Sequence, residues 1–153
     1  MKQAIVNENE YLSATDGKDL VVLIAEDDKG NYVLIRKSLE LAGISNRIIH
    51  FGNGKELLDF LYSHIKAGDI TERTYVLVLD IHMPKVNGIE VLTAIRQHNT
   101  LSGMPIIVNS SCDDKETIRL CYSLGCIDYK VKPIKANDII VALKRIGLTL
   151  SMN

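Results

Sequence analysis

Acidic side chains stand directly after two apolar segments of the chain. A run of three acids that begins with Glu26 and Asp27 follows residues 20–25, and Asp80 follows residues 75–79. Adjacent carboxylates repel one another unless a cation or a helix N-terminus stabilises them, and hard divalent ions prefer oxygen ligands. A lone carboxylate such as Asp80 suits a nucleophile or a metal ligand. The plainer alternatives are an acidic first helical turn for the run and a turn or cap role for Asp80.

Two further apolar segments end in side chains that could bind an anion. Residues 105–109 run into Ser110, whose hydroxyl can donate a hydrogen bond, and residues 127–131 run into the cation Lys132. Each is a weak indication alone, since serines often follow strands and such a lysine is usually solvated. Together with the acids, they form a set that could hold Mg²⁺ through oxygen ligands and a phosphoryl group through Ser110 and Lys132. Asp80 is the candidate acceptor.

The segments that carry these side chains have the pattern of buried parallel strands. Continuous apolar runs without polar alternation are typical of strands covered on both faces, and residues 47–51 form one more short strand. A parallel sheet brings the carboxyl ends of its strands to one edge, where chemistry gathers in such folds. Residues far apart in sequence are therefore expected to meet there.

Helical spacing lies between the strands, so the chain alternates strand and helix five times. This order predicts a doubly wound α/β domain. Asparagine or aspartate followed by glutamate three residues later marks three helix starts, and two glycines suit helix ends. These pairs are Asn53 with Glu56, Asn87 with Glu90 and Asp113 with Glu116, and the glycines are Gly43 and Gly125. The apolar positions with helical spacing are Tyr32, Ile35, Leu39, Ala42, Leu57, Leu61, Ile65, Ile89, Leu92, Ile95, Ile139, Leu143 and Ile146.

Length and composition fit one domain at residues 20–147, with a polar N-terminal extension at 1–19 and a short tail at 148–153. The chain has 153 residues, 46% of them hydrophobic, which is enough for one core. A net charge of −1 without a basic cluster argues against nucleic-acid binding. No apolar stretch approaches the roughly 20 residues that span a bilayer, and no signal core precedes the domain, so we expect a cytoplasmic protein without membrane contact. The odd count of three cysteines predicts reduced thiols.

The ordered set of motifs resembles the receiver domain of two-component response regulators. The resemblance extends over residues 20–147, nearly the whole chain. The segment 121–125 and the long link at 63–74 further resemble single-domain regulators that partner bacterial phytochromes. The motifs are Glu26-Asp27, Asp80 with Met83-Pro84 and Gly88, Ser110, and Lys132-Pro133.

The resemblance implies a fold and a metal site. The fold is the flavodoxin-like one, with a five-stranded parallel sheet in the order 2-1-3-4-5. Asp80 would be the phosphoacceptor, and Asp27 would contact Mg²⁺ directly while Glu26 acts through water. Asp80 and the backbone carbonyl of His82 would complete the metal ligands. A cis peptide bond before Pro133 is also implied.

The resemblance also implies a switch. Ser110 would bind a phosphoryl oxygen and move on activation, Lys132 would pair with the phosphoryl group, and Tyr129 would turn inward. A packed strand-edge tyrosine is the alternative for Tyr129. Departures from similar domains are polar Asn109 where an aliphatic residue is usual, and Ser111 where alanine is commoner. His82 and Cys112 occupy positions that tune the lifetime of the phosphoryl group in this family.

The implied function is a single-domain response regulator rather than an enzyme. It would accept a phosphoryl group from a sensor histidine kinase or a phosphotransfer protein in a Mg²⁺-dependent reaction. Because only a short tail follows Ile146, we expect no output domain and a signal that passes to a downstream protein target. A homodimer through the fourth helix, the last strand and the last helix, the face around Tyr122 and Tyr129, is a further expectation. The alternatives are a phosphorelay intermediate, an aspartate-nucleophile phosphatase, which would need an acid where His82 stands, and a receiver-like module that is never phosphorylated.

Overall fold

Five parallel strands form one sheet in the order β2-β1-β3-β4-β5, as predicted. The structure is a computed structural model and describes residues 19–153, so the predicted N-terminal extension lies outside the described residues apart from Asp19. Each strand begins and ends within one residue of the predicted segment. The strands are β1 (Leu20–Ala25), β2 (Ile48–Phe51), β3 (Thr74–Leu79), β4 (Ile106–Ser110) and β5 (Asp128–Val131).

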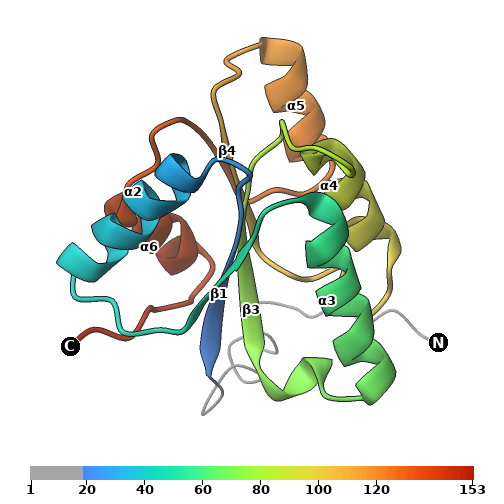
Figure 1. The fold of residues 1–153 in the computed structure, drawn as a ribbon, viewed down its shortest axis with the longest axis horizontal. Helices are drawn as coiled ribbons and strands as arrows, with labels where there is room; N and C mark the ends of the chain where they lie inside the picture. Colours follow the sequence, from blue (N-terminus) through green and yellow to red (C-terminus); the bar gives the residue numbers. More distant parts are fainter. Residues whose placement is uncertain (1–18) are drawn as a thin grey trace.

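Helices cover both faces of the sheet, which confirms the doubly wound fold (Figure 1). The first and last helices lie together on one face, and the other three lie on the opposite face. A short 3₁₀ helix, η1 (Ile70–Glu72), fills part of the long link before β3. The helices are α2 (Lys29–Leu41), α3 (Gly54–Ala67), α4 (Gly88–Gln97), α5 (Lys115–Ser123) and α6 (Ala136–Arg145).

Alternate residues of the central strands feed two separate hydrophobic cores. Leu23 and Leu77 point to the core beneath α3, α4 and α5, whereas Ile24 and Val78 point to the core beneath α2 and α6. Both faces of β1 and β3 are therefore buried, which explains why their sequences are continuously apolar. Side chains just beyond these strands are left at the carboxyl edge of the sheet.

Two of the three predicted helix starts are confirmed and one is wrong. The Asn53 side chain accepts from the Glu56 backbone N–H, and Asn87 with Glu90 forms a full capping box. The start of α5 is capped by Asp114 rather than by Asp113. The reason is Thr117, which donates both its backbone N–H and its hydroxyl to the Asp114 carboxylate, at 3.1 and 3.0 Å. Gly43 and Gly125 follow helices with positive φ, as expected.

The last residues of the chain pack against the loop between α2 and β2. Leu148 and Leu150 are buried in the core beneath α2 and α6. Ile44 and Met152 form an antiparallel bridge, and the Ser45 N–H donates to the Ser151 carbonyl at 2.9 Å. The end of the chain is thereby fixed at the edge of the sheet opposite to the acidic cluster.

Candidate functional site

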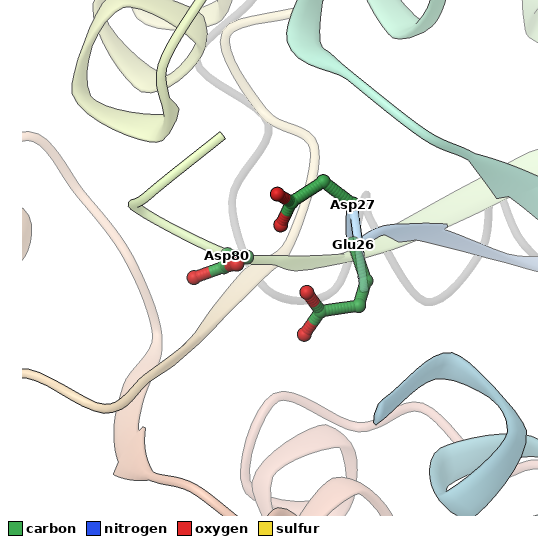
Figure 2. A group of neighbouring side chains, drawn as sticks. All are labelled: Glu26, Asp27 and Asp80. Atoms are coloured by element: carbon green, nitrogen blue, oxygen red, sulfur yellow. The ribbon is translucent and has the colours of Figure 1, made fainter. Parts of the chain in front are cut away.

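Three carboxylates from two adjacent strands meet at the carboxyl edge of the sheet. Glu26 and Asp27 follow β1, Asp80 follows β3, and one carboxylate oxygen from each lies within 4.8 Å of the others. Figure 2 shows the three side chains projecting past the ends of the strands on the same side. The neighbouring positions in the sheet order place Ser110 at the end of β4 and Lys132 just after β5. Parallel pairing therefore gathers the predicted residues at one edge.

Asp80 is held in place by both its backbone and its carboxylate. Its N–H donates to the Ala25 carbonyl at 3.0 Å, so the residue continues the pairing of β3 with β1. Its Oδ1 accepts from the His82 N–H and its Oδ2 from Lys132 Nζ, each at 3.2 Å. The residue is only 3% exposed. Gly88 is required beside it, because a Cβ on Gly88 would collide with the Asp80 carbonyl oxygen.

Lys132 links the two strands that carry the acids. Its Nζ lies 2.7 Å from Glu26 Oε1 and 3.2 Å from Asp80 Oδ2. Burial lowers the pKa of Lys132, but its hydrogen bonding and charge interaction with Glu26 and Asp80 outweigh burial and raise that pKa overall. The lysine is therefore a permanent cation between two carboxylates.

The negative charge of Glu26 is poorly stabilised by its surroundings. It is 1% exposed, and burial raises its pKa to about 7 although Lys132 and the Asp28 N–H act in the opposite direction. The nearby Asp80 charge adds to the rise. Asp27, by contrast, is exposed at the mouth of the cluster. One lysine does not compensate three carboxylates, so the cluster retains an excess of negative charge.

The donor set fits a hard divalent cation. All three side chains offer oxygen, the ligand type that Mg²⁺ and Ca²⁺ prefer, and Asp27 leaves the site open to solvent. A bound cation would also relieve the cost of ionising Glu26. These residues can therefore hold a divalent metal ion. The role of the His82 carbonyl as a ligand stays a prediction, while the His82 side chain is exposed.

The predicted switch residues meet at the backbone of Cys112. Ser110 is fully buried, and its Oγ accepts from the Cys112 N–H at 3.2 Å. The Tyr129 hydroxyl donates to the Cys112 carbonyl at 2.6 Å, and the residue is 8% exposed. Tyr129 thus lies inward in this structure. The movement of both residues on activation stays a prediction.

The remaining site predictions divide into confirmed features and residues that sequence reasoning missed. The peptide bond before Pro133 is cis, as implied, and Cys112, Cys121 and Cys126 are free thiols. His50 was missed, although its Nε2 lies 2.7 Å from the Glu26 carbonyl oxygen. A histidine within a short strand gives no signal of this contact, because the contact depends on how β2 pairs with β1.

Comparison with known proteins identifies the family. The family model that describes the response regulator receiver domain matches residues 22–144 of this chain. The chain belongs to this family. A receiver domain is the part of a response regulator that serves phosphorylation-dependent signalling, and the cluster described above lies at the strand ends of that domain. None of the helices between residues 19 and 153 is long and apolar enough to cross a membrane.

Several relatives share this receiver domain. The probable methanogenesis regulatory protein FilR2 of Methanothrix harundinacea is 30% identical over 134 residues, 88% of this chain and 84% of that protein. The chemotaxis protein CheV2 of Helicobacter pylori is 31% identical over 112 residues, which is 73% of this chain but only 34% of CheV2.

Solved structures show the same fold. The bacteriophytochrome response regulator AtBRR matches with a TM-score of 0.75 at 25% identity, covering 89% of this chain and 98% of that one. The bacteriophytochrome response regulator RtBRR matches with a TM-score of 0.70 at 31% identity, covering 87% of this chain and 81% of the other. The structural neighbours of this receiver domain therefore include single-domain regulators.

Proposed function

We propose that the chain is a single-domain response regulator that accepts a phosphoryl group on Asp80 in a Mg²⁺-dependent reaction. The donor would be a sensor histidine kinase or a phosphotransfer protein. The observation that carries the proposal is the contact of Lys132 with both Asp80 and Glu26, beside an open acidic cluster. The arrangement places a buried nucleophile, Asp80, next to the positive charge of Lys132 and next to carboxylates that could bind a metal ion.

The chemistry follows from where charge develops. An Asp80 oxygen attacks phosphorus, the P–N bond to the donor imidazole breaks, and the released imidazole takes up a proton. Mg²⁺ held by Glu26, Asp27 and Asp80 would supply electrostatic stabilisation of the phosphoryl oxygens. Lys132 stabilises the same charge and keeps the Asp80 carboxylate oriented through its contact with Oδ2. The His82 N–H holds the other oxygen, Oδ1.

The switch would act through the loop after β4. The Ser110 Oγ accepts from the Cys112 N–H, and its own hydrogen can be donated to a phosphoryl oxygen, so a phosphoryl group that draws Ser110 toward it would lengthen the contact with Cys112. Cys112 also binds Tyr129, so movement at Ser110 reaches the exposed surface of α5 and β5 through one residue. Exposed apolar side chains on α5, β5 and α6 support a protein-binding face there: they are Leu120, Tyr122, Val131 and Val141. A downstream target and a homodimer both fit this face and stay predictions.

The likeness to two bacteriophytochrome response regulators suggests the donors to test first. Both of those proteins are response regulators of bacteriophytochromes. Phytochrome-linked histidine kinases are accordingly the first candidates for phosphotransfer to this chain. The alternative of a phosphorelay intermediate would appear in the same assay as onward transfer to a histidine phosphotransfer protein.

Labelling with a small phosphodonor tests the proposal. The wild-type chain should gain one phosphoryl group from acetyl phosphate with Mg²⁺ and lose this ability in excess EDTA. Asp80→Asn should abolish labelling, because the amide cannot form an acyl phosphate. Asp28→Asn is the matched control, since Asp28 caps α2 next to the acidic pair and asparagine caps equally well. Unchanged labelling of Asp80→Asn would overturn the proposal.

A further inference from the structure

The backbone of the acidic turn is fixed by strand β2 on both sides of Glu26. The Glu26 N–H donates to the Phe51 carbonyl at 3.0 Å, one step beyond the last paired residues of β1 and β2. The Glu26 carbonyl oxygen lies 2.7 Å from Nε2 of His50. Because a carbonyl oxygen can only accept, Nε2 carries the hydrogen in this contact. A main-chain group and a side chain of β2 thus hold consecutive peptide units.

The peptide unit that His50 holds is the one that leads into Asp27. The carbonyl of Glu26 and the N–H of Asp27 belong to the same planar group, so the hydrogen bond from His50 sets the orientation of that plane. The direction in which the exposed Asp27 carboxylate leaves the backbone depends on this orientation. The His50 ring is therefore connected to the backbone from which the Asp27 side chain projects.

The His50 ring is itself held by helix α2. Tyr32 stacks on it with ring centroids 3.8 Å apart and an interplanar angle of 6°. Tyr32 lies in the first turn of α2, whose N-cap Asp28 accepts from the Asn31 N–H and donates its own N–H to Glu26 Oε2 at 3.2 Å. The acidic turn is consequently held by β2 through His50 and by α2 through its cap, and Tyr32 joins these two supports.

We infer that His50 is a positioning residue of the divalent-metal site, oriented by Tyr32. The inference rests on the proposed function, because it concerns the same acidic cluster. His50 belongs to the class of outer residues that orient metal ligands, whose loss typically lowers metal affinity by about 10- to 100-fold. A ring donor that only supported the fold would change stability and leave metal affinity intact.

Two substitutions of His50 separate its hydrogen bond from its packing. His50→Phe keeps an aromatic ring against Tyr32 but removes the donor, and His50→Gln keeps a side-chain N–H at similar reach but removes the ring. Titration calorimetry with Mg²⁺ should show affinity about tenfold weaker for His50→Phe. The affinity of His50→Gln should stay within about threefold of wild type, because the donor to Glu26 is restored. Urea unfolding in EDTA measures the free energy of unfolding of each variant independently of metal binding.

Labelling at two metal concentrations gives a second readout. With limiting Mg²⁺, His50→Phe should be labelled by acetyl phosphate more slowly than wild type, and saturating Mg²⁺ should restore its rate. Tyr32→Leu keeps the donor but removes the stacked ring, so it should weaken Mg²⁺ binding less than His50→Phe does. If His50→Phe does not fold, Tyr32→Leu and His50→Gln still test whether His50 positions the metal site. In that case, weaker binding in Tyr32→Leu with retained binding in His50→Gln would support the inference.

Two results would overturn the inference. One is wild-type Mg²⁺ affinity in a folded His50→Phe protein. The other is an equal loss of affinity in His50→Gln and His50→Phe, which would assign the effect to packing. If wild type binds Mg²⁺ and the His50 series behaves as expected, yet Asp80 is never labelled, the proposed function fails and the positioning role stands.

Discussion

Lys132 and Arg96 are two partly buried cations with opposite kinds of partner. Lys132 lies between the carboxylates of Glu26 and Asp80, at 2.7 and 3.2 Å. Arg96 donates four hydrogen bonds of 2.7–2.9 Å, all to backbone carbonyls, namely those of Ser102, Met104, Leu124 and Gly125. The first cation contacts two carboxylates of the acidic cluster, one of which is the phosphoryl acceptor that we propose. The second has partners that cannot change.

The two sets of partners indicate different roles: Lys132 belongs to the candidate functional site, and Arg96 stabilises the fold. Arg96 joins α4, the loop before β4 and the end of α5, and Gly125 is needed there because a Cβ would meet the guanidinium 2.8 Å away. Burial lowers the pKa of Arg96, yet a guanidinium stays protonated in proteins, so this contact is fixed. Lys132 instead faces Glu26, whose pKa of about 7 lets its charge respond to the surroundings. The carboxyl edge of the sheet is therefore the responsive part of the molecule.

The largest expected effect is on phosphorylation when Lys132 is replaced. Lys132→Met should slow labelling by acetyl phosphate at least about 100-fold, the usual loss for one electrostatic group at a transition state. Stability should fall little, because Glu26 can take up a proton once the lysine is gone. Labelling is followed by intact-protein mass, and stability by urea unfolding. A normal rate in Lys132→Met would contradict the role of this lysine, and Lys130→Met, on the strand that leads into Lys132, is the matched control.

Arg96 should show the reverse pattern. Arg96→Met leaves four backbone carbonyls without their charged donor, so the free energy of unfolding should drop by about 3 kcal/mol. The rate of labelling per folded molecule should stay near that of wild type. Urea denaturation measures the first quantity and labelling at low temperature the second. Arg119→Met, an exposed arginine on α5, controls for the loss of charge alone. An Arg96→Met protein with wild-type stability but slow labelling would contradict the structural role of Arg96.

Proton release on metal binding tests the responsive carboxylate. With its pKa at about 7, Glu26 is roughly half protonated at pH 7, and a bound cation requires the charged form. Mg²⁺ binding at pH 7 should therefore release roughly half a proton, and at pH 8.5 close to none. Calorimetry in two buffers of different ionisation enthalpy measures this number. Affinity should accordingly weaken as the pH falls below 7. Equal binding without proton release at both pH values would show that Glu26 is already ionised.

Asn109 offers the smallest expected effect. It is 3% exposed on β4, and its Oδ1 is buried without a hydrogen-bond partner among residues 19–153. Asn109→Val removes this unsatisfied atom and should raise the free energy of unfolding by about 1 kcal/mol. Urea unfolding measures the gain. Ser111, the next residue, also departs from the family pattern but is exposed. Ser111→Val should therefore give no gain in the free energy of unfolding. Destabilisation by Asn109→Val would show that Oδ1 has a partner such as bound water.

The fold and most of the acidic cluster follow from local sequence patterns. Continuous apolar runs identify β1 and β3 because both faces of these strands are buried, and the residues at their ends then converge by parallel pairing alone. Asp80 and Lys132 could be placed in one site for this reason. The prediction that Asp113 caps α5 was wrong. Asp113 and Asp114 have the same side chain, and only the hydrogen bonds of Thr117 with Asp114 distinguish them.

The contacts that sequence could not predict are those from side chains to distant backbone. His50 reaches the Glu26 carbonyl because of the register between β2 and β1, and Arg96 reaches Leu124 across a separation of 28 residues. Neither residue lies in a pattern that marks its partner, since any backbone carbonyl could accept the bond. Such contacts require the three-dimensional path of the chain.

Locating the phosphoryl group in the wild-type chain tests the central claim most directly. Borohydride reduces an aspartyl phosphate to homoserine, so treating the labelled protein and mapping its peptides by mass spectrometry identifies the acceptor. We predict conversion of Asp80 alone, and only when both acetyl phosphate and Mg²⁺ have been present. Conversion of Glu26 or Asp27 instead, or a labelled protein in which Asp80 stays unconverted, would contradict the account.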